Sequence, residues 1–237
     1  MFYYFGRKKQ LAGLYPDPRH GVIVEPFAGS AAYSLYGERW KNRVILFDTS
    51  SRCIGVWRFL QSCTSADIES LPDLVVGESV RDHTRLSQPE EDLIRYHINP
   101  GSNPPAITAT RASRWPAGKR YIANNLHKIQ HWEIHHKDYK EAPDITATWF
   151  VDPPYSEMLK RYYEKFDIDY TEIGRWVMNR KGMAIACEGG VSPPSYLPFN
   201  VLPGKVNNGG LNKSKRNFEY IYVAGDGGSN DVQGMYS

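Results

Sequence analysis

Short apolar runs separated by glycine, proline and charged residues define the pattern of this chain. Val22–Val24, Val44–Phe47 and Trp149–Val151 are too short for helices and rich in β-branched or aromatic residues, which predicts buried strands. Phe218–Val223 is a further apolar or alternating run near the end of the chain, and it predicts a closing strand. With the helical segments expected between these runs, the pattern predicts an α/β fold.

The third predicted strand ends in the tetrapeptide Asp152-Pro153-Pro154-Tyr155. The two prolines fix the backbone just beyond the strand, so we expect Asp152 and Tyr155 in a stiff turn where α/β sheets bind ligands. A carboxylate and a free proline carbonyl accept hydrogen bonds, and a phenol ring offers a face to a planar base. These groups suit an exocyclic amine on a nucleobase, although ordinary surface turns use the same residue types.

A turn of small residues, Pro26–Ser30, follows the first predicted strand, and we expect a helix to begin after it through Tyr33, Leu35 and Tyr36. Asp48 ends the second predicted strand, about twenty residues beyond the glycine turn, where an acid can bind a ribose hydroxyl. This spacing predicts a nucleoside cofactor. The chain lacks a complete G-x-G-x-x-G fingerprint and a P-loop, which argues against a dinucleotide or a nucleoside triphosphate.

Five motifs occur in order along the chain: Tyr4-Phe5-Gly6-Arg7-Lys8, Glu25-Pro26-Phe27-Ala28-Gly29-Ser30, Asp48, Lys137-Asp138-Tyr139 and Asp152-Pro153-Pro154-Tyr155. This set resembles the Dam-type adenine-specific DNA methyltransferases, which use S-adenosylmethionine to methylate the N6 amino group of adenine in duplex DNA. The resemblance covers residues 3 to 223, with a loose match over residues 70 to 130. It implies a Rossmann-like methyltransferase fold, with a mostly parallel sheet, helices on both faces and a small inserted DNA-recognition subdomain.

The resemblance also implies a role for each motif. The cofactor-binding residues would be Tyr4, Lys8, Pro26, Phe27, Ala28, Gly29, Ser30, Asp48, Asp138, Tyr139 and Asp152. The catalytic loop would consist of Asp152, Pro153, Pro154 and Tyr155. Among the cofactor residues, Lys8 and Gly29 would lie at the methionine end, Asp48 at the ribose and Asp138 at the adenine.

Two positions depart from the family pattern. Arg7 stands where the family usually has a second glycine, and Ala31 stands where a further glycine is frequent. Both side chains add bulk near the expected cofactor, so weaker cofactor binding is one expectation.

Positive charge is concentrated in the middle of the chain. Residues 93–132 contain no acid, but they contain Arg95, Arg111, Arg114, Lys119, Arg120 and Lys128. A segment of one sign favours phosphate binding, and we expect residues 112–129 to be mainly helical; a basic helix packed on the domain is the alternative. A late loop, 205–217, adds further basic residues. The predicted DNA-binding residues are Arg111, Arg114, Lys119, Arg120, Lys213, Lys215 and Arg216.

Length and composition are consistent with one catalytic domain carrying an insertion, because 237 residues with 41% hydrophobic content can bury a full core. We predict a catalytic domain at 1–75 and 131–225, a target-recognition region at 76–130 and a disordered tail at 226–237.

Three cysteines show neither metal nor disulfide spacing, so free thiols and no metal are expected. The sequence lacks a membrane span and a signal pattern, so we expect a cytoplasmic protein of a bacterium or phage-infected host, with a monomer favoured.

The predicted mechanism is direct methyl transfer to an adenine flipped out of the duplex. Tyr155 would stack on the base, while Asp152 and the Pro153 carbonyl would accept the two amine hydrogens. Residues 156–166 are expected to form a flap beside the site. Alternatives are an N4-cytosine DNA methyltransferase, an RNA or protein amide methyltransferase, and a catalytically inactive DNA-binding relative in which Arg7 blocks the cofactor.

Overall fold

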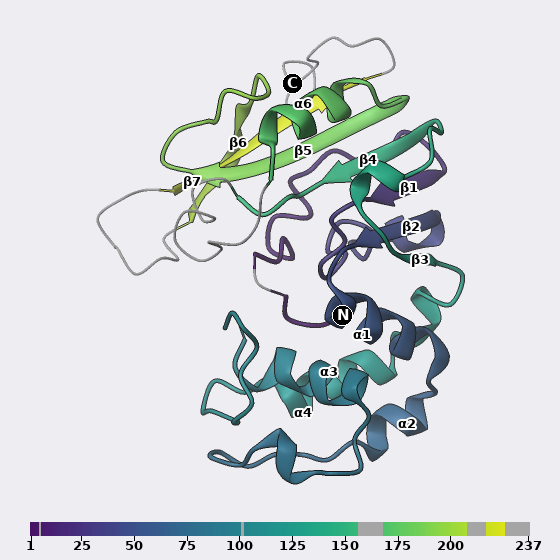
Figure 1. Ribbon diagram of the computed structural model, residues 1–237, viewed down its shortest axis with the longest axis vertical. Coiled ribbons are helices and arrows are strands. Elements are labelled where there is room, and N and C mark those ends of the chain that lie inside the picture. The colour runs from purple at the N-terminus through teal and green to yellow at the C-terminus, as the bar shows by residue number, and fades with distance from the viewer. Residues whose placement is uncertain (5, 101, 156–167, 208–216, 226–237) are drawn as a thin grey trace.

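A computed structural model of the chain describes residues 1–4, 6–100, 102–155, 168–207 and 217–225 (Figure 1). Seven strands in this part of the chain form one sheet. Their bounds are β1 Val22–Glu25, β2 Arg43–Asp48, β3 Glu133–His136, β4 Ala147–Val151, β5 Gly182–Gly190, β6 Asn200–Asn207 and β7 Asn217–Ala224. The strands predicted from the apolar runs are therefore confirmed, with small shifts at their ends.

The sheet has the strand order β3-β2-β1-β4-β5-β7-β6. Strands β1 to β5 pair with one another in parallel, whereas β7 is antiparallel to both of its neighbours, β5 and β6. The expected mixed α/β class is confirmed, but the sheet is parallel only in its first five strands. The order reverses between β1 and β4, and this switch point is where ligands bind in open α/β sheets, at the carboxyl ends of the strands.

The helices in the described residues are α1 Ser51–Ser62, α2 Ser65–Ser70, α3 Gln88–Ile98, α4 Trp115–Ala123 and α6 Tyr170–Met178. Short 3-10 turns are η1 Arg39–Lys41, η2 Val80–Asp82, η3 Leu126–Lys128 and η4 Tyr139–Glu141. None of the helices in this part of the chain is both long and apolar enough to cross a membrane.

Apolar side chains pack on both faces of the sheet because successive strand residues point to opposite sides. Ile23 of β1 belongs to a core cluster that includes Trp57 of α1. Its neighbour Val24 belongs to a second cluster that includes Val177 of α6. The two clusters leave the carboxyl ends of the central strands free to form a site.

Helices α2, α3 and α4 gather at the opposite end of the molecule from β5, β6 and β7 (Figure 1). Leu93 of α3 and Trp115 of α4 are fully buried in the same core cluster as Trp57 of α1. The helix expected over residues 112–129 is shorter than predicted, because Asn125 Nδ2 donates to the Tyr121 carbonyl at 2.7 Å and helps end the last turn of α4. The predicted insertion thus shares a hydrophobic core with the sheet.

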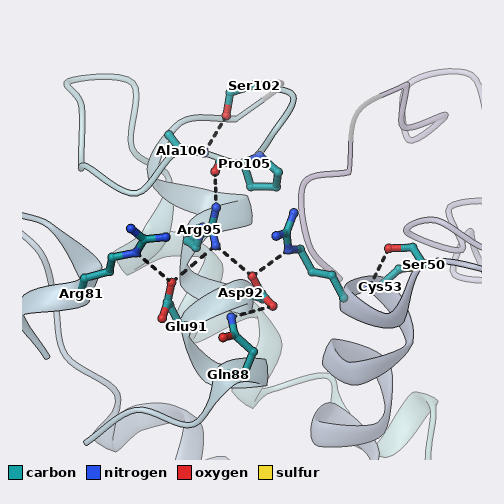
Figure 2. A network of polar contacts seen from close by, with 11 residues as sticks. Ser50, Cys53, Arg81, Gln88, Glu91, Asp92, Arg95, Ser102, Pro105 and Ala106 are labelled. Carbon is teal, nitrogen blue, oxygen red and sulfur yellow. Dashed lines mark hydrogen bonds and ion pairs between the residues drawn. The ribbon is translucent and has the colours of Figure 1, made fainter. Parts of the chain in front are cut away.

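A polar network joins α3 to α1 and to the loop after α3. Arg95 Nη2 donates to the Pro105 carbonyl at 2.9 Å, and its Nη1 lies 3.4 Å from Asp92 Oδ1 (Figure 2). Asp92 also pairs with Arg52 Nε at 2.9 Å. Because Arg95 is buried and paired with an acid just before the acid-free segment, it does not belong to the exposed basic surface that the sequence suggested.

The helix expected through residues 33–36 is wrong, because residues 26–38 form successive turns. Gly29 and Ala31 both have φ of 45°, in the left-handed region that interrupts a right-handed helix. The Glu25 carboxylate accepts the Ser34 backbone N–H at 2.9 Å, so a side chain replaces a helical acceptor there. The turn predicted at Pro26–Ser30 is present without the helix that was expected to follow.

We expect Ala31→Gly to raise the free energy of unfolding by about 1 kcal/mol, because a Cβ at positive φ is strained and glycine is not. Ala31 is the one non-glycine residue with positive φ in the described chain. Urea unfolding measures the effect, with Ala32→Gly as the control; this neighbour has no positive φ and should lose about 0.5–1 kcal/mol. Equal destabilisation by both changes would contradict the strain at Ala31.

Candidate functional site

A cavity of about 720 Å³ lies at the carboxyl ends of β1, β2 and β4, which is within the usual range for small-molecule sites. Every residue predicted to bind the cofactor or to form the catalytic loop lines it. These residues are Tyr4, Lys8, Pro26, Phe27, Ala28, Gly29, Ser30, Asp48, Asp138, Tyr139, Asp152, Pro153, Pro154 and Tyr155. The five motifs, which are separate in the sequence, are therefore brought together.

The glycine turn and Asp48 are joined by hydrogen bonds. Asp48 Oδ2 accepts from Gly29 N at 3.0 Å, and Oδ1 accepts from Ser50 N at 2.8 Å. Burial raises the pKa of Asp48, although these two backbone donors oppose the shift. Each carboxylate oxygen keeps a second lone pair, so Asp48 can still accept from a ligand hydroxyl.

Gly29 is required by the space as well as by the backbone. A Cβ built on it would lie 3.1 Å from the Tyr4 ring, and its φ of 45° is unfavourable for other residues. Its carbonyl accepts from Trp57 Nε1 at 2.8 Å, which ties the turn to α1. The turn is therefore held in place from both sides, and its backbone faces the cavity.

Aromatic side chains line another part of the cavity, beside Asp138. Tyr139 stacks on Phe27, with 5.2 Å between ring centroids and 29° between ring planes. Asp138 caps η4 by accepting from Lys140 N at 3.0 Å. Aromatic faces beside a carboxylate suit a planar ring with donor groups, as the resemblance implied for the adenine of a cofactor.

A buried polar cluster lies beside the catalytic loop. Lys8 Nζ is 3.0 Å from Asp152 Oδ1 and 3.6 Å from Glu219 Oε1, and it also contacts the Tyr155 hydroxyl. The Tyr155 hydroxyl donates to Glu219, with distances of 2.8 and 3.0 Å to the two carboxylate oxygens. Tyr15 donates to Glu219 Oε1 at 2.8 Å. One ammonium thus serves two carboxylates and a phenol.

The cluster changes the ionisation of its members. Burial raises the pKa of Asp152 to about 6; Lys8 opposes this shift, and Glu219 adds to it. Burial alone would lower the pKa of Lys8, but Asp152 and Glu219 outweigh it, so the pKa of Lys8 lies above its usual value. With both acids ionised and Lys8 charged, these three residues carry a net charge of −1.

Sequence reasoning missed Glu219 and Gly189. Glu219 is 2% exposed on β7, opposite Gly189 of β5. A Cβ on Gly189 would lie 2.3 Å from the Tyr155 ring, so this glycine makes room for that ring. The available signal was a single glutamate inside an apolar closing strand, where a charge is costly unless it is paired.

We expect Gly189→Ala to displace Tyr155 and to destabilise the fold by about 1–3 kcal/mol, the usual cost of overpacking. The same change in a Tyr155→Ala background should cost much less, because the ring that it meets is gone. Urea unfolding of the four proteins in this cycle measures the coupling. Additive losses would show that the two residues do not compete for this space.

The predicted DNA-binding residues differ in their surroundings. Arg111, Arg114 and Arg120 are exposed on and before α4. Lys119 instead pairs with Asp73 Oδ1 at 2.7 Å and donates to the Leu71 carbonyl at 2.8 Å, so it already has protein partners. The remaining predicted contacts, Lys213, Lys215 and Arg216, lie outside the described residues, as do the expected flap at 156–166 and the tail at 226–237.

Arg7 lines the cavity, but its guanidinium also lies on an aromatic ring. Its central carbon is 4.0 Å from the centroid of the Tyr3 ring. Such a contact holds a cation in place while leaving its N–H groups free to donate. Arg7 is therefore one part of the wall of the cavity and leaves space in it for a ligand.

All three cysteines are free; Cys53 and Cys187 are buried, whereas Cys63 is partly exposed. Among the described residues, no three His, Cys, Asp or Glu side chains are grouped closely enough to hold a metal ion. No protein-family model matches the chain, and no curated protein has a matching sequence. The residues of the cavity are therefore the features of this protein that indicate its function.

Proposed function

We propose that this protein is a site-specific DNA methyltransferase that transfers a methyl group from S-adenosylmethionine to the N6 amino group of adenine, on a Rossmann-like methyltransferase fold. The observation that supports it best is that all the cofactor and catalytic residues implied by the motif resemblance line one cavity. The cavity lies at the switch point of the sheet, as expected for a nucleoside-binding α/β protein.

The residues of the cavity fit this cofactor. Asp48 would accept from the ribose hydroxyls, and Phe27 and Asp138 would contact the adenine. The backbone of the Gly29 turn lines the cavity and would approach the methionine end. The net negative charge of Lys8, Asp152 and Glu219 favours a cationic ligand. When bound, S-adenosylmethionine supplies an electrophilic methyl group on a positively charged sulfur.

Asp152 would orient the target amine. Its carboxylate accepts one amine hydrogen and the Pro153 carbonyl accepts the other, which directs the nitrogen lone pair toward the methyl carbon. Methyl transfer would form the nitrogen–carbon bond and break the carbon–sulfur bond of the cofactor, which would leave as a neutral thioether. The methylated nitrogen would then release one proton to water. The negative charge of Asp152 stabilises the positive charge that develops on nitrogen.

The exposed arginines near α4 support a duplex DNA partner. Three exposed positive charges lie at the helical end of the molecule, away from the antiparallel strands: Arg111 and Arg114 precede α4, and Arg120 lies in it. Such charges bind the phosphates of DNA. Flipping the adenine out of the duplex costs a few kcal/mol, and contacts between the flipped base and the pocket offset this cost. A monomeric enzyme in the cytoplasm of a bacterial or phage-infected cell is part of the same proposal.

Expression in a methylation-deficient bacterial host, followed by sequencing that detects modified bases directly, tests this proposal. We expect N6-methyladenine at a recurring site in the host DNA. N4-methylcytosine at a recurring site would overturn the choice of base. An unmodified genome in cells that contain the protein would overturn DNA as the substrate. Calorimetry with S-adenosylmethionine then separates an inactive DNA binder, which would not bind the cofactor, from an enzyme with another substrate.

A further inference from the structure

Lys8 forms an ion pair with Asp152, the carboxylate that would accept from the target amine in the proposed mechanism. Its ammonium lies 3.0 Å from Asp152 Oδ1 and is only 5% exposed. An amine that donates to Asp152 competes with this ion pair for the same oxygen atoms. Entry of the amine therefore requires the ammonium to move away from Asp152 or to share it.

Moving a buried ammonium from its only carboxylate would cost several kcal/mol, because an unpaired buried charge is strongly unfavourable. Here a second carboxylate is close by. Glu219 Oε1 is 3.6 Å from Lys8 Nζ, so a movement of about 1 Å would bring the two within hydrogen-bond distance. Glu219 is thus an alternative ion-pair partner for Lys8 when the ammonium leaves Asp152.

Glu219 is itself held firmly. It accepts from Tyr15 at 2.8 Å and from Tyr155 at 2.8 Å, and it lies on β7 beside β5. The same carboxylate therefore fixes the hydroxyl of the ring that the mechanism assigns to base stacking. A strand residue with these contacts can position two members of the catalytic cluster at once.

We propose that Glu219 is a positioning residue: it anchors Tyr155, and it receives the Lys8 ammonium from Asp152 when a target amine enters. The inference rests on the proposed function, because it needs an amine that binds Asp152. It assigns to Lys8 a second role, as the counter-ion of Asp152 before the substrate binds. The two carboxylates share one cation, and the substrate decides which of them holds it.

The charge sharing can be measured without methyl transfer. Carbon-13 NMR of aspartate-labelled protein reports the titration of Asp152. In Glu219→Gln, Asp152 loses a neighbouring negative charge and keeps Lys8 to itself, so its pKa should fall from about 6 by about one unit. In Lys8→Met the same pKa should rise. Tyr155→Phe removes the hydroxyl but no carboxylate charge, so it should leave the titration of Asp152 almost unchanged.

Glu188→Gln is the matched control, because Glu188 is a buried glutamate on the neighbouring strand and accepts from Tyr196 at 3.0 Å. It should move neither the titration of Asp152 nor the rate. Glu219→Gln should lower kcat by about 10- to 100-fold and shift the acid limb of the rate profile to lower pH. Its Kd for S-adenosylhomocysteine should change by less than about threefold.

An Asp152 titration that does not respond to Glu219→Gln or Lys8→Met would overturn the charge sharing, whatever the activity. If Glu219→Gln does not fold, the pKa of Asp152 in Lys8→Met is the test: a rise supports the charge sharing, and no rise overturns it. If the variants show the expected shifts in the pKa of Asp152 but the wild-type protein modifies no DNA, the charge sharing is supported and only the proposed function is overturned. An unchanged kcat in Glu219→Gln, with the wild type active, would overturn the positioning role.

Discussion

Replacing Asp152 with alanine should lower the rate of methyl transfer on the order of 10³-fold, as expected when a charge-stabilising group is removed from a preorganised site. The carboxylate is the group that orients the amine nitrogen and stabilises its developing charge. Lys8, which pairs with Asp152 at 3.0 Å, would remain near Glu219, so the ammonium keeps a partner. The fold should therefore survive the change, and the loss should appear in kcat.

Single-turnover transfer of a radiolabelled methyl group measures this effect, and fluorescence anisotropy measures nonspecific DNA affinity. We expect that affinity to change by less than about threefold, because the exposed arginines near α4 are untouched. Asp144→Ala is the control, since Asp144 is an exposed aspartate paired with Lys181 outside the cavity. Retention of more than a tenth of the wild-type rate by Asp152→Ala would argue against the catalytic role.

The central strands and the place of the site could be predicted from the sequence because their signals are local. A short apolar run that ends in Asp48 or Asp152 indicates a strand and the residue at its carboxyl end. Parallel strands then bring such ends to one edge without further information. This is why widely separated motifs could be assigned to one site before the fold was known.

The features that could not be predicted depend on long-range pairing or on unusual backbone. Glu219 faces Gly189 because β7 inserts antiparallel beside β5, and no residue near either position indicates this register. The sequence around Ala31 is compatible with a helix, but a positive φ and the Glu25 carboxylate turn the chain instead. Basic residues are equally ambiguous, because Arg95 and Lys119 are held by acids or carbonyl groups.

The acid that ends β1 makes stability depend on pH. Glu25 is 2% exposed, and its carboxylate accepts from Ser34 N at 2.9 Å. Burial raises its pKa to about 7, although the hydrogen bond from Ser34 opposes the shift. Because this native pKa lies above that of the unfolded chain, the stability contribution of Glu25 is present at low pH and is lost as the pH rises through 7.

Glu25→Gln should therefore become more stable than the wild type as the pH rises. The glutamine carbonyl can still accept from Ser34, but no buried charge forms. From the usual 1.36 kcal/mol per unit, the difference in free energy of unfolding should grow from near zero at about pH 4.5 to roughly 3 kcal/mol at about pH 8. Urea unfolding at several pH values measures it. Glu133→Gln is the control: Arg43 lowers the pKa of this more exposed acid, so its effect should stay flat over this range. A difference for Glu25→Gln that also stays flat would show that Glu25 is ionised throughout and that its burial carries no such cost.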